Sequence, residues 1–135
     1  MKRFFIWEIG KRFGLNPRTI RYYERIGILP KAGRTESGYR IYSDETIKRL
    51  EFILKAKSLS LKLNEIKEIL LLHERGEAPC ECTKEFIRKK ITEIEDKIIN
   101  LTELKERLAA LLKIKKYKVA NKSICPIIEK TDRQP

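Results

Sequence analysis

The sequence NPRTIRYYER, residues 16–25, carries three arginines and two tyrosines shortly after a glycine at position 14. Asn16 can accept backbone N–H groups at the start of a helix, and Pro17 suits the first helical position, where no N–H donor is needed. We therefore expect a helix to begin at Pro17. Its arginines recur at helical spacing, and a helix of this kind places its N-terminal residues in the major groove of DNA.

The segment before this stretch predicts a second, shorter helix. Phe5, Ile9 and Phe13 recur every four residues, which favours an amphipathic helix over about residues 6–13. Gly14 can take the left-handed conformation that ends such a helix. Two helices joined by a tight glycine turn form a helix-turn-helix. The DNA contacts predicted from its second helix are Arg18, Arg21, Tyr22 and Arg25. The alternative is an ordinary solvated basic helix.

The residues after the second helix predict a wing. Gly27 supplies a helix stop, and residues 38–42 have the alternating character of a short extended segment. Arg34, Tyr39 and Arg40 on such a loop can bind backbone phosphates, because an arginine fork matches phosphate oxygens and a tyrosine hydroxyl can donate to them. The alternative is a surface hairpin whose charges are merely solvated.

The charge of the chain is positive and uneven. There are 31 Lys and Arg against 19 Asp and Glu, a net charge of +12, and residues 1–60 hold 14 basic and 6 acidic residues. A polyanionic partner is implied, and double-stranded DNA is the one we predict. No run of 18 apolar residues exists, so we expect no membrane span and a cytoplasmic protein with reduced thiols. One histidine and no nucleophile or phosphate-loop motif argue against an enzyme.

The second half of the chain predicts one long helix. From Thr83, a plausible N-cap, to about Lys116 there is neither Gly nor Pro. Apolar residues step by three or four along it: Ile87, Ile91, Ile94, Ile98, Leu101, Leu104, Leu108 and Leu111. Such a seam normally marks a coiled coil, so we expect a partner helix to cover it. A ligand-binding stripe is the lesser alternative.

These residues, taken in order, resemble the MerR family of transcription regulators. The resemblance rests on Ile9-Gly10, Gly14, residues 19–25, residues 27–29, Arg34, residues 38–40 and Tyr42. It implies a mainly α fold, with a winged helix-turn-helix head followed by a long antiparallel coiled-coil dimerisation helix. It also implies a homodimer that distorts promoter DNA with an over-long spacer, so that RNA polymerase engages when an effector binds. It adds Thr19, Tyr23 and Tyr42 to the expected DNA contacts.

The resemblance also covers the following segments and sets the expected domain bounds. Ser43 should cap a helix through about Lys57, and residues 63–74 should form a further helix. Where the family usually has Gly-Phe-Ser or Gly-Phe-Thr, this chain has Ser-Leu-Lys at 60–62, so the cap of the further helix is not defined by its sequence. We expect a DNA-binding domain at 1–75, a linker and dimerisation helix at 76–116, and an effector-binding loop and tail at 117–135.

Three cysteines flank the long helix. Cys80 and Cys82 precede it and Cys125 follows it. Roughly 34 helical residues span about 50 Å, whereas the nine steps from Lys116 to Cys125 reach only about 30 Å. Cys125 therefore cannot meet Cys80 of its own chain unless the helix breaks. In an antiparallel dimer, Cys80 and Cys82 would face Cys125 of the partner subunit, which predicts a metal site shared between chains.

Sulfur ligands select zinc, cadmium, lead, mercury or copper(I) over magnesium and calcium. The resemblance disfavours copper(I), because Cys80 falls where the divalent-metal sensors of the family carry cysteine and the copper(I) sensors carry serine. Cys125 resembles the second cysteine of the family's metal-binding loop. The first is missing, with Lys115 or Lys116 near its place, and Cys82 is the predicted replacement. A thiol-oxidation-responsive regulator of the same fold and a DNA-binding protein with no metal response remain the alternatives.

Overall fold

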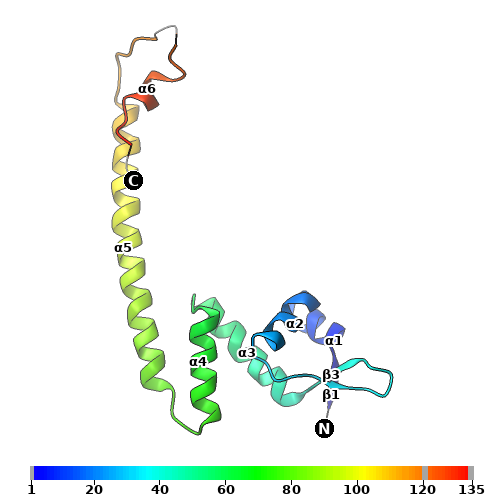
Figure 1. Ribbon diagram of the computed structural model, residues 1–135. Helices are drawn as coiled ribbons and strands as arrows, with labels where there is room; N and C mark the ends of the chain where they lie inside the picture. Colours follow the sequence, from blue (N-terminus) through cyan, green and yellow to red (C-terminus); the bar gives the residue numbers. More distant parts are fainter. Residues whose placement is uncertain (1, 120–121, 134–135) are drawn as a thin grey trace. The chain divides into compact units, whose positions relative to one another are not determined.

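A computed structural model describes residues 2–119 and 122–133 of the chain (Figure 1). The chain divides into two compact units, residues 1–90 and residues 91–135, which we describe separately. The first unit holds a small sheet and helices α1 to α4, and it includes the start of the long helix α5. The second holds the rest of α5 and the short helix α6.

Helices α1 (Ile6–Phe13) and α2 (Pro17–Arg25) form the predicted helix-turn-helix. Gly14 ends α1 in the left-handed conformation, with φ 65°, and the side chain of Asn16 accepts a hydrogen bond from the backbone N–H of Arg18 at 2.9 Å. The turn is tight because Leu15 donates its N–H to the carbonyl of Gly10 at 2.9 Å. A Cβ added at Gly10 would lie 2.8 Å from the carbonyl oxygen of Leu15, so this turn requires glycine there.

A three-stranded antiparallel sheet lies beside these helices. Its strands are β1 (Arg3–Phe5), β2 (Gly33–Arg34) and β3 (Arg40–Ser43), in the order β1-β3-β2. Strands β2 and β3 with the turn at residues 35–39 make up the wing, in which Arg34 is paired with Arg40. The wing is therefore present as predicted, but residues 38 and 39 belong to its turn. Strand β1 was not predicted, because three residues are too few to show a period.

Helices α3 (Asp44–Ser58) and α4 (Leu63–Glu74) follow within one or two residues of the predicted bounds. The hydroxyl of Ser43 accepts from the backbone N–H of Thr46 at 3.4 Å and caps α3 as expected. Ser60 takes φ 65°, a conformation that glycine adopts without cost. At the start of α4 the N–H of Lys62 donates to the carboxylate of Glu65 at 2.8 Å, which supplies the cap that the Ser-Leu-Lys sequence left undefined.

One hydrophobic core joins α1, α2, β3, α3 and α4. Its members are Ile9, Ile20, Tyr23, Ile28, Leu29, Tyr42, Ile47, Leu50, Ile53, Ala56, Leu61, Ile66, Ile69 and Leu70. Two cations also fasten the end of α2 to the later helices. Arg49 of α3 donates to the carbonyl oxygen of Ile28, and Lys67 of α4 donates to that of Ile26, each at 2.7 Å. Helix α2 is thus held in place by residues that are distant from it in the sequence.

Helix α5 (Cys80–Leu112) differs from the prediction at both ends. It begins before Thr83, whose hydroxyl donates to the carbonyl of Pro79 at 3.0 Å and so is not an N-cap. It ends before Lys116, because residues 113 and 114 make only i to i−3 bonds. The tail then folds against the helix end, where Arg107 donates to the carbonyl of Asp132 at 3.1 Å.

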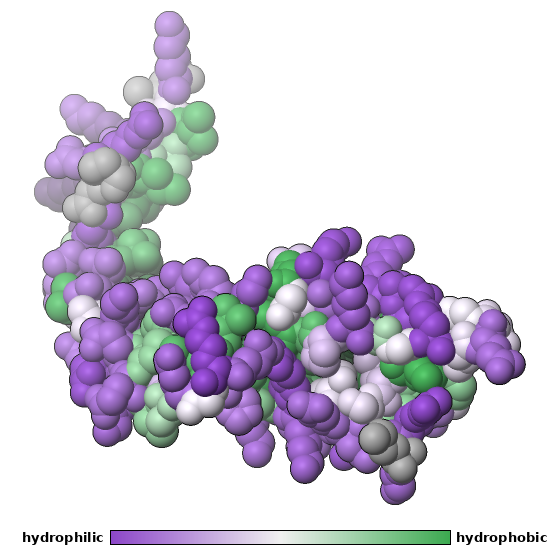
Figure 2. Space-filling view, turned by 60° about the horizontal axis from the view of Figure 1, so that its bottom comes forward, coloured by the Kyte–Doolittle hydropathy of each residue, from purple (hydrophilic) through white to green (hydrophobic). Residues whose placement is uncertain are grey.

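Helix α5 has no buried residue in this single chain. The predicted seam residues that stay exposed are Ile87, Ile91, Ile94, Ile98, Leu101, Leu104 and Leu108. Figure 2 shows hydrophobic residues, drawn in green, left open among hydrophilic ones. Helix α6 (Pro126–Glu129) follows in the second unit, with Cys125 at its N-cap position. An apolar surface of this length requires a partner to cover it.

Candidate nucleic-acid interface and cysteine positions

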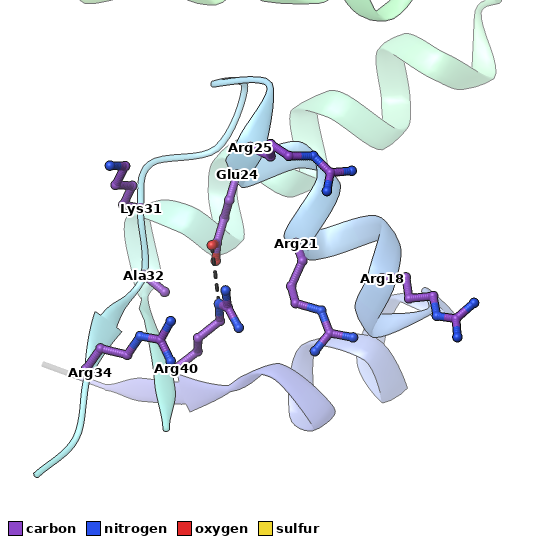
Figure 3. Close-up of a pocket in the computed structure, with 8 residues that line it drawn as sticks. All are labelled: Arg18, Arg21, Glu24, Arg25, Lys31, Ala32, Arg34 and Arg40. Carbon is purple, nitrogen blue, oxygen red and sulfur yellow. Dashed lines mark ion pairs between the residues drawn. The ribbon is translucent and has the colours of Figure 1, made fainter. Parts of the chain in front are cut away.

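Helix α2 and the wing enclose a groove of about 640 Å³ that is lined almost entirely by charged side chains. The lining residues are Arg18, Arg21, Glu24, Arg25, Lys31, Ala32, Arg34 and Arg40. Figure 3 shows Arg18, Arg21 and Arg25 on α2, with Arg34 and Arg40 coming from the wing strands. Six cations around one groove attract a polyanion, and their arrangement on a helix and a flanking strand pair suits duplex DNA.

The fold of α2 explains why its arginines face the groove. Ile20 is fully buried on the opposite side, so a period of 3.6 residues leaves Arg18, Arg21 and Arg25 exposed. The guanidinium of Arg25 lies 5.4 Å from the ring centre of Tyr22, a distance typical of a cation–π contact. The predicted contacts from α2 are therefore accessible together on one face. Thr19 is only partly exposed and stays a predicted contact.

The wing residues are held by local bonds. Arg34 donates from Nη1 to the carbonyl oxygen of Gly38 at 2.8 Å, across the turn of the wing. Tyr39 is 67% exposed at that turn, and its N–H donates to the hydroxyl of Thr35 at 3.1 Å. Arg40 faces the groove and pairs with Glu24, with Nε 3.4 Å from Oε2. The three predicted wing contacts thus sit on an ordered hairpin.

Two predicted DNA contacts, Tyr23 and Tyr42, lie in the core instead. Tyr23 is 1% exposed and its hydroxyl accepts from Nζ of Lys57 at 3.1 Å. Tyr42 is 2% exposed, and its pKa is raised far above the ordinary value, first by burial and then by the hydrogen bond and charge of Glu24. A buried side chain cannot reach a phosphate unless the core opens, so both tyrosines are core residues in this structure, and their burial disfavours the predicted DNA contact.

Sequence reasoning missed three residues of the groove, Glu24, Lys31 and Ala32. Glu24 follows Arg21 by three positions, so helical spacing alone would have placed it on the arginine face. Lys31 lies in the irregular segment before β2, where no period indicates which side chains point inward.

The cysteines are divided between the two units. Cys80 is exposed at the first position of α5, Cys82 is half-buried two residues later within the first turn, and Cys125 lies in the second unit. Burial raises the pKa of the Cys82 thiol, and the charge of Glu68 raises it further. Within the described residues of one chain, no three Cys, His, Asp or Glu side chains are grouped so that they could hold a metal ion. A site shared between two chains remains a prediction.

The three thiols differ in their exposure. Cys80 is open to solvent, whereas Cys125 is half-buried like Cys82 and lies at the N-cap position of α6 without a side-chain cap hydrogen bond. Thiolate is the ligand form of cysteine, and the raised pKa of Cys82 lowers the fraction of its thiol that is ionised at neutral pH. None of the helices in the described part of the chain is long and apolar enough to cross a membrane.

Comparison with known proteins agrees with this geometry. A family model described as "MerR HTH family regulatory protein" matches residues 5–72, and one described as "MerR, DNA binding" matches residues 47–111. The mercuric resistance operon regulatory protein of Bacillus cereus is 43% identical over 129 residues, which cover 94% of this chain and 96% of that protein.

Two solved structures share the fold. The transcription regulator PbrR691 from Ralstonia metallidurans CH34, in complex with lead(II), matches with a TM-score of 0.76 and 28% identity over 92% of this chain and 95% of that one. MerR from Bacillus megaterium MB1, in complex with mercury(II), matches with a TM-score of 0.62 and 35% identity over 89% and 92%. With its winged helix-turn-helix and long helix, the chain belongs to the MerR family of transcriptional regulators, which are not enzymes.

Proposed function

We propose that this chain is a homodimeric regulator that binds promoter DNA and responds to a thiophilic, divalent metal ion. The observation that supports the proposal is that Cys80 is the first residue of α5, while Cys125 follows that helix in the chain at the N-cap position of α6. The names of similar proteins support it, since the Bacillus cereus relative is a mercuric resistance regulator and the two solved structures hold lead(II) and mercury(II). Mercury, lead, cadmium and zinc are therefore the candidate ions.

The dimer follows from α5. Its apolar seam is exposed in the single chain, and burying that seam against a second copy would contribute most of the association free energy. Antiparallel pairing sets the start of one α5 beside the end of the other. Cys80 would then approach Cys125 of the partner subunit, and the dimer would hold two such sites.

The proposed metal site has two principal donors and one candidate third donor. Cys80 of one subunit and Cys125 of the partner subunit supply the first two thiolates, and Cys82 is the candidate third. Soft thiolates select the heavy divalent ions over magnesium or calcium. Three thiolates on a divalent ion leave one net negative charge, which Lys115 and Lys116 near the end of α5 would offset.

Response to the ion would act through the same helix. Each winged helix-turn-helix head is continuous in the chain with α5. A metal bound at the ends of the paired helices would therefore change the separation of the two heads. We propose that this change distorts the promoter and lets RNA polymerase engage. The distinction between repression and activation then lies in the geometry of the dimer, with the same DNA contacts in both states.

The shared site is tested by subunit complementation. Cys80→Ser and Cys125→Ser homodimers should each lose metal binding, which we would follow by the ultraviolet absorbance of metal–thiolate bonds with mercury(II), cadmium(II), lead(II) and zinc(II). Mixing the two variants should restore one site per heterodimer. No recovery would contradict a site shared between chains. Cys82→Ser homodimers serve as the matched control, and they should keep measurable binding if Cys80 and Cys125 are the principal donors.

The same titration, read out as transcription from the chain's own promoter, tests the metal response itself. Output that changes with one of these ions, and not with magnesium, is expected. Thiol oxidation is the second candidate, because Cys80 is exposed and therefore accessible to oxidants. A response of the reduced protein to diamide but to none of the ions would favour oxidation and would contradict the metal proposal.

A further inference from the structure

Glu24 is an anion in the middle of the cationic groove. Its carboxylate shares that groove with six Arg and Lys side chains, and a negative charge facing DNA phosphates opposes binding. Figure 3 shows Glu24 extending from α2 toward the wing, where it meets Arg40. The ion pair has Nε 3.4 Å from Oε2, with side-chain exposures of 10% for Glu24 and 29% for Arg40. The pair therefore crosses the groove below its open surface.

The burial of Glu24 excludes direct base reading. A glutamate reads cytosine by accepting from its N4 amino group, which requires the carboxylate to project into the major groove. Here Oε1 is buried, and so is the hydroxyl of Tyr42. Neither atom has a hydrogen bond of good geometry within the described residues, yet the carboxylate is close enough to raise the pKa of Tyr42. The carboxylate of Glu24 thus lies close to both Tyr42 of the core and Arg40 of the wing.

The Glu24–Arg40 pair is a polar link between α2 and β3. Arg40 pairs across the wing with Arg34, so its position also sets the strand that carries Arg34. The arginines of α2 and of the wing come from separate elements, and fixed spacing between them is what a defined stretch of duplex requires. A free Arg40 would still bind phosphate, but it would do so on any sequence.

We propose that Glu24 is a positioning residue for DNA recognition, which holds Arg40 of the wing in a fixed orientation relative to α2. It increases the preference for the operator over other DNA, although its charge opposes binding to any DNA. This inference rests on the proposed promoter binding.

Glu24→Gln gives a test in which the competing explanations predict different outcomes. The operator would first be selected from random-sequence duplexes with the wild-type full chain. We expect the variant to bind a random duplex at least as tightly as the wild type and the operator more weakly. The specificity ratio, which is the dissociation constant for the random duplex divided by that for the operator, should fall at least about fivefold, as loss of one coupled contact implies. If Glu24 acts only as a charge, both duplexes bind more tightly and the ratio stays constant, which would overturn the proposal.

Glu36→Gln is the matched control. Glu36 is exposed in the turn of the same wing, so its replacement removes an equal charge without touching the groove. The control variant should keep the wild-type ratio on the operator and the random duplex. Equal loss of ratio in both variants would contradict a specific role for Glu24.

Arg40→Ala tests whether Glu24 acts through Arg40. In the Arg40→Ala background, Glu24→Gln should cause no further fall of the ratio. A fall as large as the one that Glu24→Gln causes in the wild-type chain would overturn the positioning role. Unfolding is monitored by circular dichroism. If Glu24→Gln does not fold, Glu24→Asp keeps the charge but shortens its reach, and its ratio should fall in the same direction; an unchanged ratio would refute the proposal. A wild-type chain with no operator preference would instead refute the proposed function.

Discussion

Ile98 and Ile99 are neighbours on α5 with nearly equal exposure, 57% and 56%, yet only Ile98 belongs to the predicted seam. Successive residues of a helix point about 100° apart, so a partner that covers Ile98 leaves Ile99 in solvent. Replacing each isoleucine in turn by alanine therefore tests the dimer interface with a change of the same size. We expect Ile98→Ala to weaken the dimer and Ile99→Ala to leave it nearly unchanged.

The magnitude follows from burial. An Ile→Ala change costs roughly 2–5 kcal/mol where the side chain is fully buried. Because Ile98 is already nearly half covered in one chain, about half of that cost belongs to the partner's contact. A two-fold dimer contains the change twice, so dimer formation should lose about 2–5 kcal/mol, or at least about 30-fold in Kd.

Sedimentation equilibrium of the full chain over a wide concentration range measures this Kd. Ile99→Ala should change it less than about threefold, as expected for a surface substitution. Equal weakening by the two variants would refute the proposed face of α5, and a wild-type chain that stays monomeric at micromolar concentration would refute the dimer itself.

Three further predictions concern the head. Arg21→Ala should weaken promoter binding about tenfold at fixed salt, measured by fluorescence anisotropy, because Arg21 faces the groove. Asn16→Ala removes the cap of α2 and should lower the free energy of unfolding in urea by about 1 kcal/mol. Burial opposes ionisation of Glu65, but the N–H of Lys62 and the charge of Lys90 outweigh it and lower its pKa. Glu65 should therefore stabilise the fold at neutral pH and lose that contribution as the pH falls below about 4.5, and Glu65→Gln should remove this dependence in urea titrations.

Each of these has a contrary result. If Arg21→Ala leaves the promoter affinity unchanged, Arg21 does not contact DNA. If the variant also unfolds at a lower temperature than the wild type, its weaker binding reflects a loss of folding and not of a DNA contact. A stable Asn16→Ala protein would mean that Pro17 alone defines the start of α2. For Glu65, the sign is fixed: the unfolded state binds the proton first, so stability that rose on acidification in this range would contradict the lowered pKa.

Much of the head was predictable because its signals are local. Asn16, Pro17 and Ser43 act on backbone groups within three residues, and the left-handed turn at position 14 favours glycine. Such features depend on the nearest residues alone, so the sequence indicates them without knowledge of the fold. The exposed arginines of α2 follow from the same short-range periodicity.

The remaining features depend on contacts between distant segments. Tyr23 has the chemistry of a surface residue, although its spacing of three from the buried Ile20 places it on the core face of α2, and only the structure shows that its hydroxyl is bound by Lys57 of α3. The end of α5 falls at Leu112, ahead of the predicted Lys116, although neither Gly nor Pro marks that position. The cysteines remain a prediction for a related reason, since a site shared between subunits requires the second chain.

The cations that hold the end of α2 bind main-chain oxygens. Arg49 and Lys67 donate to the carbonyls of Ile28 and Ile26, and every residue type offers the same carbonyl. The support of α2 is therefore independent of its outward-facing side chains. Outward-facing residues of α2 can be exchanged during evolution, so that a descendant recognises a different operator, while the attachment of that helix to α3 and α4 is inherited unchanged.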